Sequence, residues 1–442
     1  MRSLLSMHLL SSYMLVLTGT NGPIGVIRAI QGVSEMIFSF PVAHVADKRL
    51  RRDTCLRAAG VSGFVCAVVL AYAFHSGQLY TLYAAYAVLG VFLAAFTPPL
   101  EALFIDSIPF GQRTAPLLIK NSIMYGAMTS MGPILSIIGF LWFGNTWKLP
   151  QLNVMMYVGI FFLAVACIVL FMFRDNHITK ATDNTTEEIV PLRTPTMVAT
   201  ELMEVTFDEN DARREEAQQA TQLFTESTPL IGLQEMENES AKATTLCGWL
   251  SEKHVPWLLY LSDVIMYQAD GMTVNYLGVF FVKEYGMLPI QLEVTCLFQA
   301  ATILGFSALA RHGALQFGRI ETMVAVRAVS IVALVLLCYV RWLPLVLCFF
   351  LLRVGMTCSV LPLSRSMLMD YVPKNERATW NAFDSVTRFA FAESAVVGGL
   401  IIDHYGSYRL CFLIAAIVAV VGLVVDLLVL PLVRHRRWDS HA

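Results

Sequence analysis

Twelve long apolar runs, arranged in two groups of six, limit what this chain can fold into more than any other feature. Each run is bounded by polar residues or by Gly and Pro. Irregular backbone cannot face lipid, because no water is present there to pair its N–H and C=O groups. The runs therefore predict membrane-spanning helices. They lie at 4–18, 23–46, 55–75, 79–105, 115–143, 152–173, 256–282, 288–310, 319–341, 343–369, 379–402 and 407–433.

The composition agrees with a chain that lies mostly in lipid. Of its 442 residues, 56% are hydrophobic and 14% are charged, and the mean hydropathy is +0.62, whereas a soluble protein has about 25% charged residues. We predict an all-α integral membrane protein with 12 transmembrane helices in two pseudo-symmetric halves. The expected parts are an N-terminal six-helix half at 1–173, an acidic loop at 174–253, a C-terminal six-helix half at 254–433 and a basic tail at 434–442.

The first apolar run, 4–18, is short for a membrane span, which needs about 20 residues. Two explanations fit. Either the first helix is short or tilted, or the natural chain begins upstream of Met1. We favour the second.

Basic residues predict the orientation of the helices. Loops after the second, fourth, eighth, tenth and twelfth runs are richer in Lys and Arg than the loops on the opposite side. Loops with an excess of Lys and Arg tend to be cytosolic. We therefore expect both termini and the loop at 174–253 to lie in the cytosol.

The loop at 174–253 differs in composition from the rest of the chain. It contains 16 acidic and 7 basic residues, whereas the rest of the chain contains 17 acidic and 24 basic residues. It is also poor in aromatic residues, so it lacks the apolar content to fold alone and is predicted to be disordered.

A candidate sorting motif lies in this loop. Glu226 precedes the pair Leu230 and Ile231 by four residues, which fits an acidic dileucine signal. Such a signal would bind a clathrin adaptor and direct the protein to an endosomal or lysosomal membrane. The alternative is a chance match, which would leave the plasma membrane as the expected location.

One segment of the chain is repeated. Both copies contain Pro, a charged residue, Asp, Pro and Arg in the same order, with another charge after the Arg. The signs of the first and last charges are reversed between the copies, and the repeat indicates two halves built alike. The first copy contains Glu101, Asp106, Arg113 and Lys120, and the second contains Arg365, Asp370, Arg377 and Asp384.

A basic motif follows the second apolar run. The chain reads Ala-His-Val-Ala-Asp-Lys-Arg-Leu-Arg-Arg from Ala43. This resembles the loop signature of the major facilitator superfamily, in which Ala43 and Leu50 would both be glycine. Their replacement puts the tight turn of the signature in doubt. The matching positions are Asp47, Lys48, Arg51 and Arg52.

Together with the six-plus-six runs, the long loop and the repeat, the signature gives a resemblance that covers the whole chain. The resemblance implies two halves that pack around a central cavity and open alternately to each side of the membrane. It also implies that Asp47 and Arg51, with Asp106, lock the cytosolic helix ends. The alternative is that these charges lie in interfacial water. We expect a monomer.

The reversed charges of the repeat allow two pairings. Glu101 with Lys120, and Arg365 with Asp384, would be structural pairs within each half. Alternatively, Glu101 meets Arg365 and Lys120 meets Asp384 across the pseudo-two-fold axis. The second pairing would form a cytosolic gate that breaks when the cavity opens.

Ionisable residues inside the predicted spans are candidates for function, because each costs about 3 kcal/mol to insert. Glu35, Asp270 and Glu393 are the candidate proton carriers; the alternative is that each only neutralises a nearby Arg. Arg353 is a candidate ligand for a carboxylate or phosphate, or else an ion-pair partner. The candidates for substrate binding or coupling are Arg28, Glu35, Asp263, Asp270, Asn275, Gln299, Arg353, Arg388 and Glu393.

We therefore expect a secondary active transporter of a small polar or charged solute, with protons as one possible coupling ion. A facilitative uniporter is the first alternative, and a transporter-like receptor or scaffold without flux is the second. No Ser/His/Asp set, metal-ligand cluster or phosphate-binding Gly loop stands out, so we expect neither an enzyme nor a bound cofactor or metal. The expected partners are the solute and the bilayer, not nucleic acid.

Overall fold

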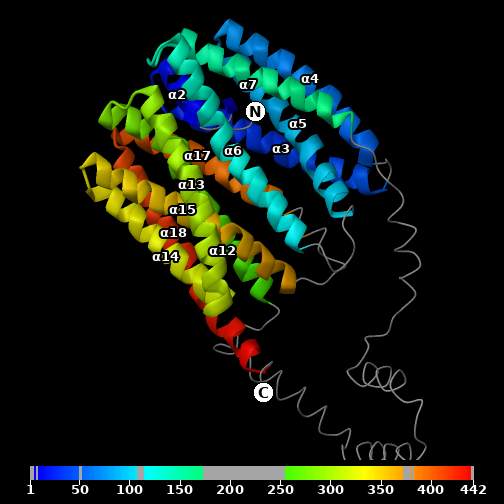
Figure 1. The fold of residues 1–442 in the computed structure, drawn as a ribbon, viewed down its shortest axis with the longest axis vertical. Helices are drawn as coiled ribbons and strands as arrows, with labels where there is room; N and C mark the ends of the chain where they lie inside the picture. The colour runs from blue at the N-terminus through cyan, green and yellow to red at the C-terminus, as the bar shows by residue number, and fades with distance from the viewer. Residues whose placement is uncertain are drawn as a thin grey trace, which may run out of the picture. The chain divides into compact units, whose positions relative to one another are not determined.

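The computed structural model describes residues 4–5, 8–48, 52–106, 114–172, 254–371, 380 and 383–439. Twelve helices account for nearly all of these residues, and the described part contains no strand (Figure 1), which confirms the predicted fold class. The helices are α2 (His8–Thr18), α3 (Gly22–Lys48), α4 (Arg52–Ser76), α5 (Leu79–Asp106), α6 (Thr114–Phe143), α7 (Leu149–Leu170), α12 (Val255–Tyr285), α13 (Pro289–Gln316), α14 (Arg319–Tyr339), α15 (Leu343–Tyr371), α17 (Asp384–Tyr405) and α18 (Tyr408–Asp439).

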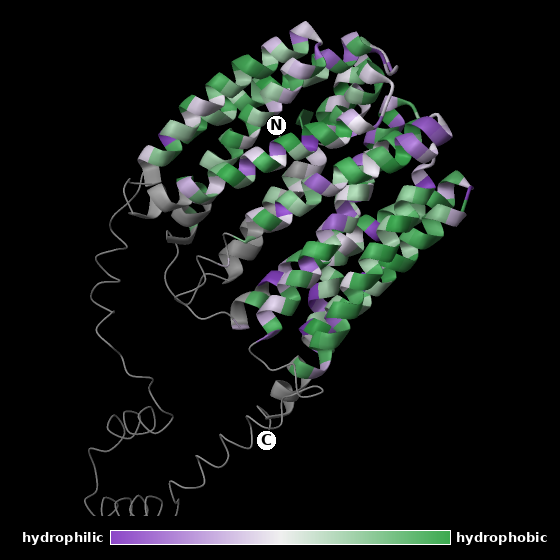
Figure 2. Cartoon of the chain, turned by 180° about the vertical axis from the view of Figure 1, so that it is seen from behind, coloured by the Kyte–Doolittle hydropathy of each residue, from purple (hydrophilic) through white to green (hydrophobic). Residues whose placement is uncertain are grey.

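Length and composition make many of these helices fit to cross a bilayer. In the described part of the chain, 8 helices are long and apolar enough to span it. Large apolar side chains on them point outward, such as Val68 at 70% exposure and Phe161 at 63%. Figure 2 shows hydrophobic residues along most of the helices. Such surfaces suit lipid rather than water.

Tight turns join consecutive helices, and glycines with positive φ make several of them possible; two examples show how. α12 ends at Gly286, with φ of 63°, and α17 ends at Gly406, with φ of 65°. A left-handed residue lets the chain leave the helix while its N–H still bonds to a carbonyl of the last turn, and glycine adopts this conformation without steric cost. The next helix therefore runs back antiparallel to the one before.

The helices pack into one compact unit that includes residues on both sides of the acidic loop. We call α2 to α7 the N-terminal half and α12 to α18 the C-terminal half. Three helix pairs join the halves: α3 with α17, α6 with α13, and α2 with α12. We call the helix ends at 172 and 254 the loop side, and the opposite ends, which include the turns at 19–21 and 286–288, the far side.

Two parts of the predicted organisation cannot be compared with the structure. The acidic loop, including Glu226, Leu230 and Ile231, lies outside the described residues. The placement of both termini in the cytosol stays a prediction as well.

Candidate functional site

α3 and α17 cross closely at the centre of the molecule, and two glycines of α3 allow it (Figure 1). A Cβ atom on Gly25 would clash with the backbone of Ala395, and one on Gly32 would clash with the Cβ of Ala392. Because the clash at Gly25 is with backbone, no side-chain rotation could relieve it. The two halves therefore meet here along their helix backbones.

A carboxylate of the C-terminal half holds the far-side end of this crossing. Asp403, at the end of α17, accepts hydrogen bonds from the backbone N–H groups of Asn21, at 2.8 Å, and Gly22, at 2.6 Å. It also accepts one from Nδ2 of Asn21 at 2.9 Å. These N–H groups lie at the N-terminus of α3, where the helix dipole favours an anion. Tyr408 adds a hydrogen bond to Oδ1 of Asn21 at 2.9 Å.

A second set of far-side contacts joins the turn before α7 to the turn before α13. Nε1 of Trp147 donates to the carbonyl of Met287 at 2.8 Å. The N–H of Ile290 donates to Oδ1 of Asn145 at 3.0 Å. Together with the bonds of Asp403, these contacts hold the two halves together on the far side.

Toward the middle of the crossing, one ion pair joins the halves. Nε of Arg388 on α17 lies 3.4 Å from Oε1 of Glu35 on α3. Beyond Glu35, toward the loop side, Ile37 and Phe40 of α3 are 56% and 47% exposed.

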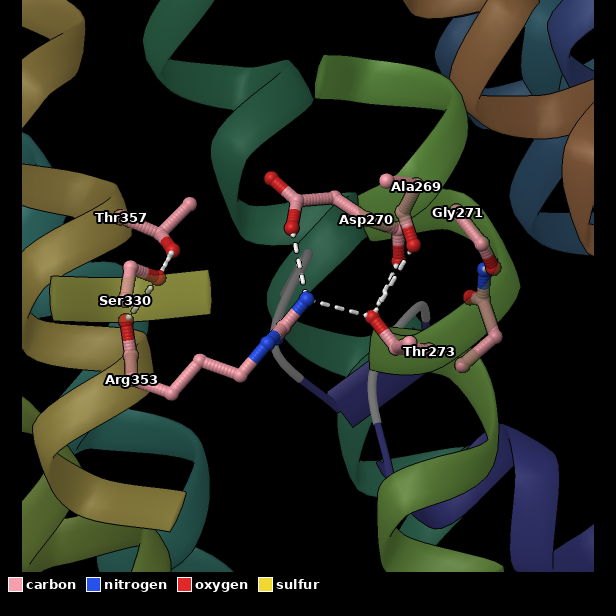
Figure 3. Close-up of polar contacts among 8 residues, drawn as sticks. Ala269, Asp270, Gly271, Thr273, Ser330, Arg353 and Thr357 are labelled. Carbon is pink, nitrogen blue, oxygen red and sulfur yellow. Dashed lines mark hydrogen bonds and ion pairs between the residues drawn. The ribbon is translucent and has the colours of Figure 1, made fainter. Parts of the chain in front are cut away.

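A polar cluster lies inside the C-terminal half, between α12, α14 and α15 (Figure 3). Nη2 of Arg353 donates to Oδ1 of Asp270 at 2.9 Å and to the hydroxyl of Thr273 at 2.7 Å. Beside this pair, the hydroxyls of Ser330 and Thr357 lie 2.7 Å apart. The guanidinium of Arg353 is only 3% exposed, and its Nη1 has no hydrogen-bond partner among the described residues.

A small pocket opens beside this cluster. Its lining includes Asp270, Arg353, Ser330 and Thr357, together with apolar residues such as Leu334. A buried guanidinium nitrogen without a partner is costly unless something pairs with it. The pocket is therefore suited to a small ligand that carries a hydrogen-bond acceptor or a negative charge.

A second buried ion cluster lies nearer the loop side of the same half. Arg327 of α14 bonds to Asp263 of α12 and to Asp426 of α18, and it also donates to Oγ of Ser262 at 2.9 Å. Ser364 of α15 donates to Asp263 at 2.6 Å. One cation and two carboxylates thus tie four helices together.

The sequence interpretation missed Arg327 and Asp426, and the signal for them was present. Both are ionisable residues inside predicted spans, which is the rule that selected Asp263. Glu293 on α13 and His8 on α2 also lie inside predicted spans, and the sequence interpretation missed them as well. In the sequence, all four lie inside predicted spans and are flanked by apolar residues.

The structure places the other candidates as follows. Gln268 donates to Glu393 at 3.3 Å, and Nδ2 of Asn275 bonds to the carbonyl of Gly271 in its own helix at 3.0 Å. Arg28 is buried on α3, and Gln299 lines a pocket with His8 and Glu293.

Most side chains of the proposed gate and signature lie outside the described part of the chain. Arg365 is exposed, but the pairing partners expected for it belong to a group whose side chains lie outside the described part of the chain. The pairings therefore stay predictions. The group consists of Asp47, Lys48, Arg51, Arg52, Glu101, Asp106, Arg113, Lys120, Asp370, Arg377 and Asp384.

Known structures share this arrangement of helices. A D-xylose-proton symporter matches with a TM-score of 0.64 and 12% identity, over 96% of this chain and 92% of that chain. The nucleoside transporter NupG matches with a TM-score of 0.59 and 14% identity, over 96% and 94%. A bacterial homologue of the human lysosomal transporter Spinster, in an inward-facing and unoccupied conformation, matches with a TM-score of 0.61 and 11% identity, over 97% and 92%.

Identities this low establish the fold alone. No curated protein sequence matches the chain. The sequence profile of the Major Facilitator Superfamily, however, matches residues 2–383 and, in a second match, 260–442. The family and the similar structures are transporters, which confirms the expectation that the protein is not an enzyme. The chain belongs to the Major Facilitator Superfamily.

Proposed function

We propose that the protein is a secondary transporter of a small polar or charged solute. The observation that carries the proposal is the buried guanidinium of Arg353, which faces a small pocket with one nitrogen unpaired. A lipophilic solute would leave that nitrogen unpaired, whereas a solute with a carboxylate, phosphate or several hydroxyl groups would satisfy it. Asp270 and the hydroxyls of Ser330 and Thr357 offer complementary acceptors and donors.

We propose alternating access as the mechanism. The far-side contacts between the halves are hydrogen bonds at turns and helix ends, which can break and re-form without disturbing either half. Asp403 and Asn21 hold the far side closed, and Glu35 is the deepest described polar contact between the halves. Breaking these contacts would let α3 and α17 separate on the far side.

Three proteins with similar structures agree with a polar solute. They are a nucleoside transporter, a D-xylose-proton symporter and a POT family transporter in complex with 5-aminolevulinic acid. Proton coupling fits the carboxylates buried at membrane depth. A uniporter would show equal rates of solute uptake with and without a pH gradient. A receptor would bind the solute without moving it across the membrane.

We also propose that the dileucine motif at Glu226, Leu230 and Ile231 sends the protein to endosomal or lysosomal membranes through a clathrin adaptor. The support is its match in sequence, in a loop that basic-residue counts place in the cytosol. Replacement of Leu230 and Ile231 with Ala should move a fluorescent fusion to the plasma membrane. An unchanged distribution would contradict the motif.

Flux in reconstituted vesicles tests the transport proposal. The probes are a nucleoside, D-xylose, 5-aminolevulinic acid and a dipeptide, each added with and without a pH gradient. We expect uptake of at least one probe, and its loss by tenfold or more in Arg353→Gln, because the variant removes a charged hydrogen-bond donor worth about 1.5–3 kcal/mol. Arg341→Gln, at an exposed arginine, is the matched control.

A second variant separates a folding defect from lost binding. Arg353→Gln leaves Asp270 without its cation, so Arg353→Gln is also tested with Asp270→Asn, which leaves a neutral pair. If the double variant folds and takes up the probe at the wild-type rate, the Arg353 pocket is not the solute site. Binding of a probe without flux would favour a receptor.

A further inference from the structure

A second small pocket lies on the interface between the halves, where α2, α6 and α13 meet. Its polar lining consists of His8 from α2, Thr129 and Ser136 from α6, and Glu293 and Gln299 from α13. The remaining lining includes Leu9 and Pro133, which are apolar. The pocket is therefore separate from the Arg353 pocket, which lies inside the C-terminal half.

Glu293 is the unusual member of this pocket. It is 3% exposed, and no hydrogen bond or ion pair reaches its carboxyl group from the described residues. Ser136 is fully buried, and its hydroxyl also lacks a hydrogen-bond partner among the described residues. An ionised carboxylate is very costly in such surroundings, and a carboxyl group so placed takes up a proton instead.

The three carboxylates selected from the sequence are in a different situation. Glu35 faces Arg388, and Asp270 faces Arg353. Glu393 accepts a hydrogen bond from Gln268. Glu293 differs from all three, because none of the described residues donates a hydrogen bond to its carboxyl group or pairs with it.

The charged groups around α13 leave Glu293 without a fixed counter-charge. His8, from α2, is the titratable group that faces it from another helix, and Cys296 lies on its own helix. The two buried arginines of α14 and α15, which both pack against α13, are engaged elsewhere. Arg353 of α15 pairs with Asp270 of α12, and Arg327 of α14 pairs with its two carboxylates.

The location of the pocket connects this proton to the transport cycle. α6 and α13 belong to different halves and pack against each other, with Glu293 one turn from the far-side end of α13. Separation of the halves on the far side would bring water to the pocket. We infer that Glu293 binds the coupling proton: a carboxylate oxygen takes it from far-side water when the pocket is hydrated, and the neutral carboxyl then permits closure.

This inference rests on the proposed transport function, but its first test needs no solute. The full chain is reconstituted in vesicles, and infrared spectroscopy measures the carbonyl stretch of protonated carboxylic acids at neutral pH. We expect Glu293→Gln to lose part of this band, and Glu35→Gln, the matched control, to keep it. An unchanged band in Glu293→Gln would overturn the inference. A band that disappears when sodium replaces potassium at constant pH would also overturn it, because the carboxyl group would then bind sodium instead of a proton.

The second test follows the far side itself. Spin labels at Tyr80 and Tyr405, which are 84% and 63% exposed, report the distance between the halves. In the wild type we expect the population with a long distance to grow as the pH rises, because the ionised carboxylate disfavours closure. Glu293→Gln should remain closed across the same pH range. An identical pH response in the variant would overturn the inference.

Flux separates failure of this inference from failure of the transport proposal. A wild type that moves no probe would contradict transport, while the infrared result for Glu293 would stand. If a pH gradient drives probe uptake equally well in the wild type and in Glu293→Gln, the role of Glu293 is overturned and the transport proposal stands.

Discussion

The two halves use their buried charges differently. In the C-terminal half, Arg327 and Arg353 pair with carboxylates of the same half, so these charges tie its own helices together. In the described part of the N-terminal half, Arg28 and Glu35 are the charges at membrane depth, and Glu35 pairs with Arg388 of the other half. The difference indicates that internal pairs make the C-terminal half a rigid body, while the pairs between halves can exchange.

The largest expected effect is the loss of Arg327. Arg327→Leu would leave Asp263 and Asp426 buried without their cation, and removal of one partner of a buried pair costs about 3–5 kcal/mol. Thermal unfolding in detergent should show a strongly lowered midpoint, and Arg341→Leu, at an exposed site, should show little change. Equal stability of the two variants would mean that the cluster does not hold the C-terminal half together.

A smaller effect is expected from Gly25→Leu, which inserts a side chain between α3 and α17. Overpacking of a close contact costs about 1–3 kcal/mol. Here it destabilises only the conformation in which the far side is closed, because α3 and α17 touch at Gly25 in that conformation. The spin-label distance across the far side should lengthen. Gly305→Leu is the control, because a Cβ there meets nothing within 4 Å; a similar lengthening in the control would contradict the account.

The smallest effect is expected from Asp403→Ala. The carboxylate is exposed, so water replaces its hydrogen-bond partners in the variant, and we expect a net loss of only about 0.5–1.5 kcal/mol. The open population on the far side should rise about two- to tenfold, as measured by the distance between spin labels at Tyr80 and Tyr405. Glu284→Ala removes a far-side carboxylate that bonds within its own half, to Arg409 at 2.9 Å, and should have no such effect. If it raises the open population equally, Asp403 is not a specific clamp.

The fold could be predicted from the sequence because the bilayer sets the length and hydropathy of its helices. The twelve apolar runs correspond to the twelve helices, and the signature around Asp47 indicated the family that the whole-chain match confirms. The central arrangement of charges was harder to predict. Whether Asp270 meets Arg353 or another arginine depends on how α12, α14 and α15 pack, which no spacing within one helix determines.

The clamp at Asp403 could not be predicted for a different reason. Asp403 and Asn21 are ordinary polar residues near turns, and no rule singles them out until α3 and α17 are placed side by side. Glu293 could have been found, because it lies inside the predicted span 288–310 as an isolated acid. Its importance comes from the lack of a partner, which only the structure shows.

A comparison of two distances in the same protein tests the central claim most directly. One pair of spin labels, at Tyr80 and Tyr405, crosses the far side between the halves; the other, at Tyr339 and Tyr405, lies within the C-terminal half. When the pH is raised or a transported probe is added, we predict that the first distance changes and the second stays constant. A change within the C-terminal half as large as the change between the halves would contradict the account.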